Sequence, residues 1–487
     1  MITLNKVVYN LKYNWNIHSF LIIIYFLLSS FNNHFDEKQI IWVDFLKVVS
    51  FTIIFIIAIW LFQKKLKYNQ EYFILLSLTL CVCLFYSTLI NLHGNITFNA
   101  LLIPFEILVV YFIFFYYLKK VSSHWKIRFY LNCYFIILCT IELSLLPKKE
   151  VDFVNDDKQL IFSNSTFKEH DQLVGNENNP NIYILFYDGY ANEKNLTNYF
   201  NFDNSLFIKQ IKSKGFYYVP NSHSNYNQTL KTWASFLNLG YLKTNKEIDL
   251  LSSIKFNLLT EYIFKKAYNI VNLSPFQIGD NSNYNSYDLM FGNASLSNHL
   301  YVRTIFFKFE RFLKYHILGY KIENNKIALL TNIMNAKPNN KPNLVLYHSM
   351  ITHYPYQFDE NGNHKLELFL HGVKQRMQDY LTQLKYTNKL INQTIDNILL
   401  KQPNSIIVIA SDHGYRQIEG QSLKLVEQES FENFCAFYFP DKKYNMLYDS
   451  ISVVNIFRIV VSKIKKDNPV FVKDIQCKSI TSKTLQR

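Results

Sequence analysis

The chain has 487 residues, of which 49% are hydrophobic and 17% aromatic, and its formal net charge is +14. The length is sufficient for more than one domain. A basic chain invites comparison with nucleic-acid-binding proteins, but half of the excess positive charge lies in the apolar first 149 residues, and no nucleic-acid-binding motif is found. We therefore expect no nucleic-acid partner.

The first 149 residues contain five apolar stretches, and most of them approach the roughly 20 residues that a helix needs to cross a bilayer. They lie at about residues 16–31, 40–62, 72–92, 98–118 and 129–146. The first stretch is short, and a signal peptide is the alternative for it, but no small-residue cleavage site follows. Residues 1–149 are therefore predicted to form a transmembrane domain of about five helices, with four or six as the alternatives.

The loops between these stretches predict the orientation of the chain. Loops rich in Lys and Arg alternate with loops that are poor in them, and positive loops are typical of the cytoplasmic side. The positive loops and the N-terminus contain Lys6, Lys12, Lys64, Lys65, Lys67, Lys119, Lys120, Lys126 and Arg128. An odd number of spans then places everything after Pro147 outside the cytoplasm, although Lys148 and Lys149 are a contrary signal.

The polar part of the chain begins with residues 150–180, which have no clear pattern and are predicted to be a linker. From residue 181 onward, short apolar runs typical of buried parallel strands alternate with helical patterns. Strands are predicted at 182–187, 215–219, 344–348, 406–410 and 434–439, and helices at 195–214, 230–239, 366–400 and 451–463. The alternation predicts an α/β domain over 181–487, with a mainly parallel sheet covered on both faces and an insertion at about 243–340.

Acidic residues follow two of the predicted strands. Asp188 comes directly after residues 182–187, and the run Ser411-Asp412-His413-Gly414 follows 406–410. Ligands of open α/β sheets lie at the carboxyl ends of strands, and carboxylate oxygen and neutral imidazole nitrogen are accepted by Zn²⁺ and Mn²⁺. Asp188 alone could simply cap the next segment, and Asp412-His413 alone could be a turn. The two strand ends together favour a metal site.

A nucleophile for such a site is predicted at Thr229, which lies at the start of the predicted helix 230–239. A threonine at this position is usually an N-cap, but the free N–H groups of a helix start also suit a phosphate. Thr232 and Ser235 are the neighbouring alternatives, about one and two turns further into the helix. Thr229 follows Asp188 by 41 residues.

This pattern resembles the alkaline phosphatase superfamily, and within it the membrane-anchored sulfatase-like branch that includes phosphoethanolamine transferases and lipoteichoic acid synthases. The resemblance is carried by residues 188–190, 224–238, 348–358 and 411–416. It implies a multi-span helical membrane domain followed by an alkaline-phosphatase-like α/β/α domain. It implies one divalent metal, zinc or manganese, and a substrate-binding role for His353 at the transferred phosphate. The implied metal ligands are Asp188, Thr229, Asp412 and His413, with Thr229 also the nucleophile.

The sequence departs from the family pattern in two places. The formylglycine signature of true sulfatases, Cys or Ser followed by x-Pro-x-Arg, is absent around Thr229, which argues against a formylglycine-dependent sulfatase. Phosphoethanolamine transferases usually carry an acid after the glycine of Ser-Asp-His-Gly, where this chain has Tyr415. A second metal is less favoured, since its nearby candidate ligands are limited to His348, Asp359 and His364.

The resemblance implies a transferase that moves a phospho-substituent from a membrane lipid donor to an envelope glycan or lipid. The chain would lie in the inner membrane with its catalytic domain outside the cytoplasm, where tethering raises the effective concentration of a lipid donor. A hydrolase of phosphate or sulfate esters with the same site is the alternative, and an inactive envelope-assembly scaffold is a third. Cys435 and Cys477 are expected either to form a disulfide or to remain free thiols.

Overall fold

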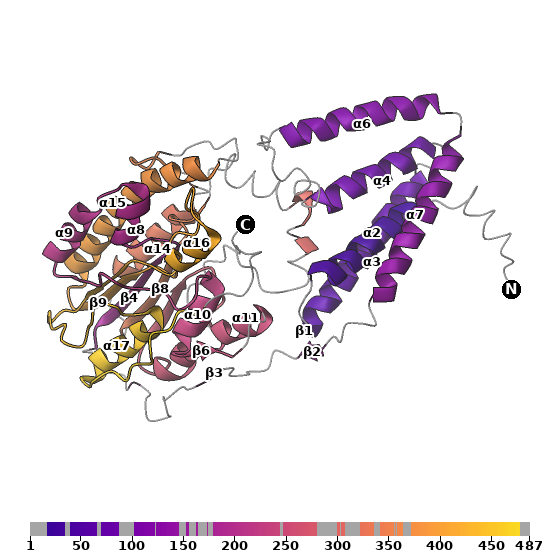
Figure 1. Cartoon of the computed structure of the whole chain (residues 1–487). Coiled ribbons are helices and arrows are strands. Elements are labelled where there is room, and N and C mark those ends of the chain that lie inside the picture. Colours follow the sequence, from indigo (N-terminus) through magenta and orange to yellow (C-terminus); the bar gives the residue numbers. More distant parts are fainter. Residues whose placement is uncertain are drawn as a thin grey trace. The chain divides into compact units, whose positions relative to one another are not determined.

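The computed structural model separates into two compact units (Figure 1). The helical unit contains Met1–Asp157, Ala294–Tyr320 and Leu368–Leu370, and the α/β unit contains the remaining residues. The structure describes residues 17–34, 39–65, 70–86, 102–121, 123–145, 152–154, 162–163, 173, 179–243, 247–279, 300–301, 303–306, 322–335, 341–354, 356, 358–363 and 372–477.

The helical unit contains helices over the apolar stretches of the sequence. They are α2 (His18–His34), α3 (Trp42–Lys65), α4 (Gln70–Leu84), α6 (Leu102–Lys120) and α7 (His124–Leu145). Within the described residues one helix, α7, is long and apolar enough to cross a membrane, and α2, α3 and α4 contain shorter apolar segments. Large apolar side chains face outward on these helices, including Phe51 (71% exposed), Phe112 (67%) and Tyr130 (68%). Multi-pass insertion remains a prediction.

A segment from much later in the sequence also belongs to the helical unit. Within Ala294–Tyr320, Leu300 joins the apolar core formed by α2, α3, α4 and α7. The Arg303 guanidinium donates a hydrogen bond to the Ser30 hydroxyl and lies 5.6 Å from the centroid of the Phe26 ring. This part of the region predicted to be an insertion therefore packs with the N-terminal helices.

The α/β unit is built on a six-stranded sheet with the order β5-β10-β9-β4-β8-β7. The strands are β4 (Asn181–Tyr187), β5 (Tyr217–Tyr218), β7 (Asn269–Leu273), β8 (Asn343–Ser349), β9 (Ser405–Ala410) and β10 (Cys435–Tyr438). Strands β9, β4, β8 and β7 are parallel, whereas β10 runs antiparallel to both β9 and β5. The predicted α/β class with a mainly parallel sheet is confirmed.

Helices cover both faces of this sheet because its central strands are apolar on both sides. Ile184 and Phe186 of β4 pack into one apolar cluster, and Tyr183 and Leu185 pack into the other. The first cluster includes α10 (Thr229–Leu237), α11 (Glu247–Lys255) and α17 (Val453–Lys465). The second includes α8 (Glu193–Phe200), α9 (Ser205–Ser213), α14 (Ile322–Asn335), α15 (Val373–Lys401) and α16 (Leu423–Glu429).

The remaining elements are short. They are β1 (Gln39–Ile41), β2 (Asp152–Val154), β3 (Phe162–Ser163), β6 (Tyr241–Leu242) and the π-helical turn Leu259–Ile263. Strand β1 pairs with β2, and β3 pairs with β6.

Two local predictions are wrong. The helix predicted at 195–214 is two helices, because Asn201 adopts a left-handed conformation (φ 50°) and ends α8. The insertion predicted at 243–340 contains β7, which extends the central sheet beside β8. Cys435 and Cys477 are free thiols.

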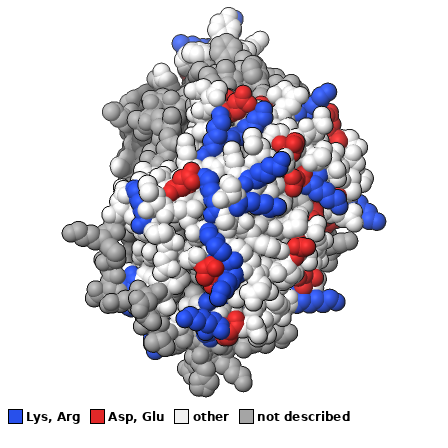
Figure 2. Space-filling view, turned by 90° about the vertical axis from the view of Figure 1, so that its left-hand side faces the viewer, with Lys and Arg blue, Asp and Glu red and all other residues white. Residues whose placement is uncertain are grey.

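The charged surface of the molecule mixes both signs on the face shown in Figure 2, where Lys and Arg lie among Asp and Glu. Ion pairs in the α/β unit join Lys214 to Asp396 at 2.5 Å and Lys463 to Asp441 at 2.9 Å. Interspersed charge of this kind is typical of a solvated surface.

Candidate metal centre

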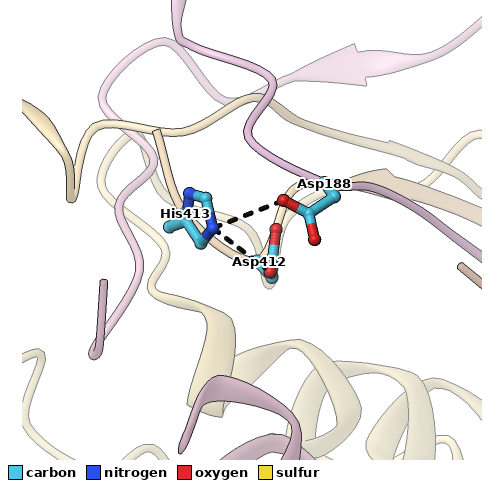
Figure 3. Close-up of side chains that lie close together, drawn as sticks. All are labelled: Asp188, Asp412 and His413. Carbon is cyan, nitrogen blue, oxygen red and sulfur yellow. Dashed lines mark ion pairs between the residues drawn. The ribbon is translucent and has the colours of Figure 1, made fainter. Parts of the chain in front are cut away.

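The candidate site lies at the carboxyl ends of two adjacent parallel strands. Phe186 of β4 pairs with Ala410 of β9, so the residues that follow each strand meet at the same edge of the sheet. Asp188 follows β4, and Asp412 and His413 follow β9; their side chains converge in Figure 3. Both aspartates are fully buried.

One oxygen of the Asp188 carboxylate is fixed by hydrogen bonds. Its Oδ2 accepts from the Thr229 hydroxyl at 3.2 Å and from His348 Nε2 at 3.2 Å. The indole Nε1–H of Trp233, which can only donate, binds His348 Nδ1 at 2.9 Å. His348 Nδ1 is therefore the acceptor, and Nε2 carries the hydrogen that reaches Asp188. The Oδ1 atom of Asp188 takes no part in this arrangement.

Asp412 and His413 are each held by one hydrogen bond to a backbone group. Asp412 Oδ1 accepts from the N–H of Gly189 at 3.2 Å. His413 Nδ1 lies 2.7 Å from the carbonyl oxygen of Gly414 and donates to it. This contact leaves the lone pair on His413 Nε2, as in histidines that bind a metal through Nε2.

The three remaining atoms, Asp188 Oδ1, Asp412 Oδ2 and His413 Nε2, are buried and have no hydrogen-bond partner. They lie within 4.8 Å of one another, with His413 Nε2 3.4 Å from Asp188 Oδ1 and 3.6 Å from Asp412 Oδ2 (Figure 3). Lone pairs that face one another in a buried site are costly unless a cation lies between them. Two carboxylates and one neutral imidazole are a donor set that fits a divalent metal such as zinc or manganese.

The surroundings of Asp188 keep its carboxyl group ionised. Burial alone would raise the pKa of the Asp188 carboxyl, but its neighbour His353, the hydrogen bond from His348 and its neighbour His413 hold that pKa well below its usual range. Burial, followed by the charge of Arg416, lowers the pKa of His413. A lowered pKa favours the neutral imidazole of His413, which is the form that binds a metal.

Two glycines make these turns possible for different reasons. Gly189 has φ +71°, a conformation that favours glycine. At Gly414 the reason is space, since a Cβ atom would lie 2.3 Å from the carbonyl oxygen of Glu432. Ser411 supports the second turn: its hydroxyl donates to the carbonyl of His413 at 2.6 Å and accepts from the N–H of Tyr190 at 2.9 Å.

The structure places the three candidate nucleophiles in different surroundings. Thr229 is the first residue of α10, and its hydroxyl points to Asp188. The Thr232 hydroxyl donates instead to the carbonyl oxygen of Asp412 at 3.0 Å, and the Ser235 hydroxyl donates to the carbonyl of Gly240 at 2.6 Å. Of the three hydroxyls, that of Thr229 is the one bonded to a carboxylate of the cluster.

The loop before Thr229 is held by a segment from the end of the described chain. Asn225 Nδ2 donates to the carbonyl of Ile475 at 3.0 Å, and the N–H of Cys477 donates to the carbonyl of Asn225 at 2.8 Å. Asn225 Oδ1 also accepts from the N–H of Val454 at the start of α17. The position of the candidate nucleophile therefore depends on residues far away in the sequence.

His353 lies beside the cluster rather than within it. Its Nδ1 is 2.6 Å from the carbonyl oxygen of Tyr354, and its Nε2 is 3.3 Å from Nη2 of Arg416. Tyr415, in contrast, is buried against the rings of Phe200 and Tyr380. Because position 415 packs into the core, the missing acid there carries little information about the substrate.

The sequence predicts His348 as a candidate ligand for a second metal, and it does not predict the observed roles of His348, Trp233 and Arg416. Arg416 could have been suspected, because it follows the Ser-Asp-His-Gly turn by two residues, but neither His348 nor Trp233 carries a local signal as a partner of Asp188. Among the candidate ligands for a second metal, Asp359 forms a local turn with Asn361 and Asn363. His364 lies outside the described residues.

A mainly parallel sheet whose strand ends bring two aspartates and a histidine together beside a threonine defines an α/β enzyme with a candidate metal centre. The chain belongs to the sulfatase family: residues 203–475, more than half of its length, match the family model Sulfatase. The match includes Thr229, His353, Asp412 and His413 and confirms the sulfatase-like resemblance. The protein is therefore an enzyme of the sulfatase-like hydrolase and transferase class.

Solved structures similar to this chain include the C-terminal periplasmic domain of EcEptC from Escherichia coli, with 13% identity over 66% of this chain and 95% of that chain and a TM-score of 0.40. The soluble domain of lipooligosaccharide phosphoethanolamine transferase A from Neisseria meningitidis has 13% identity over 60% and 91% of the two chains (TM-score 0.36). The integral membrane form of that protein has 11% identity over 74% and 67% (TM-score 0.38). A search of curated proteins found no match.

Proposed function

We propose that the protein is a membrane-bound, metal-dependent transferase that moves a phospho-substituent from a lipid donor to a cell-envelope glycan or lipid. The observation that carries the proposal is the convergence of three buried, unpaired ligand atoms beside the Thr229 hydroxyl. An inactive scaffold would have no reason to keep such atoms unpaired in its interior.

Asp188, Thr229, Asp412 and His413 would hold one divalent ion, zinc or manganese. When bound, this ion supplies positive charge that lowers the pKa of a nearby hydroxyl and stabilises negative charge on the group being transferred. The protein supplies the orientation, since Asp188, Asp412 and His413 each have a second polar atom fixed by a hydrogen bond.

In the first half of the proposed reaction, Thr229 Oγ1 forms a bond to phosphorus, and the bond from phosphorus to the lipid alcohol breaks. The Thr229 hydroxyl, which is oriented by its hydrogen bond to Asp188 Oδ2, gives up its proton to solvent, and the lipid alcohol takes a proton from solvent. In the second half, an acceptor hydroxyl attacks phosphorus and loses its proton, and Thr229 is released and protonated. Water in place of the acceptor would make the enzyme a hydrolase.

The proposal is tested by following the phospho group in cells and in the purified full-length protein. We expect cells that contain the protein to carry an envelope glycan or lipid with an added phospho-substituent, detected by mass spectrometry, which cells without it lack. We also expect the purified protein to transfer a labelled substituent from a phospholipid. Release of free phosphate or sulfate from esters without transfer would favour the hydrolase, and no reaction with either class would contradict both.

We further propose a multi-pass inner-membrane protein in which residues 1–149 form the membrane domain, 150–180 a linker and 181–487 the extracytoplasmic catalytic domain. The alternating positive loops and the exposed apolar side chains of α3, α6 and α7 support this arrangement. A periplasm-active reporter fused after Lys149 is expected to be active, and the same reporter fused after Lys65 is expected to be inactive. The reverse pattern would show that the orientation is wrong.

A further inference from the structure

Arg416 is a partly buried cation at the point where three loops of the site meet. Its Nη1 donates to the carbonyl oxygen of Asn227, two residues before Thr229, at 3.3 Å. Its Nη2 donates to His353 Nε2, in the loop after β8, at 3.3 Å. Arg416 itself belongs to the turn that carries His413, whose pKa its charge helps to lower.

Within the described part of the chain, no carboxylate is in direct contact with Arg416. Among the residues that the structure describes, Arg416 forms no ion pair, although the α/β unit pairs other cations such as Lys214 and Lys463 with aspartates. A partly buried guanidinium without a counter-charge is costly unless an anion binds it. The structure therefore contains a positive group, beside an anionic ligand cluster, whose natural partner is outside the chain.

The histidine next to it cannot take over this role in the arrangement observed. His353 Nδ1 donates to the carbonyl oxygen of Tyr354, and His353 Nε2 accepts from Arg416, so both ring nitrogens are used. A guanidinium has five N–H groups, and the contacts with Asn227 and His353 use two of them. The donors that remain for a ligand belong to Arg416.

We propose that Arg416 is the anion-binding residue of this site, where it holds the non-bridging oxygens of a tetrahedral phospho group, and that His353 is a positioning residue for its guanidinium. This inference rests on the proposed function and changes the expected role of His353. The planar guanidinium suits bidentate binding to phosphate oxygens. The same chemistry is offered by the phosphodiester of a lipid and by free phosphate, which the test must separate.

The test uses the full-length protein and two probes: inorganic phosphate, titrated against metal-free protein, and a short-chain phospholipid donor in a turnover assay. We expect Arg416→Gln to weaken phosphate binding and to raise KM for the phospholipid, each by about 10- to 100-fold, the usual loss for a hydrogen bond to a charged group. Arg416→Lys should retain part of the binding. The charge-matched control Lys385→Gln, in which the exposed ion pair with Glu360 is lost, should change neither value.

The positioning role of His353 is tested by two substitutions of different chemistry. His353→Gln keeps an acceptor for Arg416 and should bind phosphate nearly as well as wild type, whereas His353→Leu removes the acceptor and should weaken binding several-fold. Thermal unfolding of each variant verifies that it is folded.

The inference is overturned if folded Arg416→Gln binds phosphate like wild type, or if only inorganic phosphate binding changes while KM for the lipid does not. It is also overturned if both His353 variants lose binding equally. A wild-type protein that binds phosphate through Arg416 but never turns over a lipid would contradict the proposed function and leave the anion site intact. If the wild-type protein turns over the lipid normally and Arg416→Gln changes neither phosphate binding nor KM, the proposed function stands and the anion site is wrong.

Discussion

Thr229→Ala is expected to lower the turnover of a phospholipid donor by on the order of 10³-fold or more, because losses of this size are typical when a catalytic nucleophile is removed. The reason is positional: Thr229 is the first residue of α10 and its hydroxyl is hydrogen-bonded to Asp188. Free N–H groups at the start of the helix can also hold a phosphoryl oxygen. The measurement is steady-state turnover of the full-length protein, with tandem mass spectrometry of the stalled enzyme to map a phospho-threonine.

Two neighbours provide the comparison. Thr232→Ala removes a hydroxyl bonded to the carbonyl oxygens of Tyr226 and Asp412, and its main effect should be on local packing and stability. Ser235→Ala removes a hydroxyl bonded to Gly240 and should leave turnover close to wild type. Normal turnover by Thr229→Ala, or a modification mapped to another residue, would show that the proposed mechanism is wrong even though the family is right.

Asp412→Asn is expected to abolish stoichiometric metal binding. The wild-type protein should bind about one divalent ion per chain, zinc or manganese, because two buried carboxylates and one imidazole converge on one point. The substitution preserves side-chain size but removes a charge from a ligand whose Oδ2 has no other partner. The loss of affinity should exceed ~100-fold, the upper range for residues that only support metal ligands. Elemental analysis after gel filtration and competition with a chromophoric chelator give the two quantities.

Trp233→Phe is expected to lower the metal affinity by a smaller factor than Asp412→Asn, although Trp233 is not a candidate ligand. Without the indole N–H, His348 is free to place its hydrogen on Nδ1, and its Nε2 lone pair would then face Asp188 Oδ2. We expect metal affinity to fall by about 10- to 100-fold. Phe236→Leu is the control, because Phe236 packs in the same aromatic layer without a hydrogen bond to His348. Stoichiometric metal in Asp412→Asn, or equal losses in the two aromatic variants, would point to different ligands.

The central part of the fold is readable from the sequence because its signals are local. The apolar runs before Asp188 and Asp412 are long enough to identify β4 and β9, and the order of strands and helices is that of a parallel α/β sheet. β7 is less visible, since Asn269–Leu273 includes two asparagines and lies at the edge of the sheet. The antiparallel direction of β10 could not be predicted, because a buried strand has the same apolar pattern in either direction.

The residues of the candidate site also differ in whether a local sequence signal predicts them. Asp188, Asp412 and His413 are found because each follows a predicted strand, and adjacent parallel strands end at the same edge. The roles of His348 and Arg416 depend on which atoms meet across more than 60 residues of sequence, and a single sequence holds no record of such contacts. From the sequence, Tyr415 is interpreted as a position that reports on the substrate, because it is close to the ligands in the chain. In the structure its side chain packs in the core.

The contact between Asn225 and the segment around Ile475 and Cys477 has a consequence for the way the enzyme is made. Asn225 is separated from Ile475 by 250 residues, so the ribosome completes β4, α10 and β9 well before the partners of this loop exist. A nascent or prematurely released chain can hold the aspartates and the threonine and still lack the bonds that fix the threonine's loop. We therefore expect the loop before Thr229 to reach its final position only after residue 477 has been synthesised.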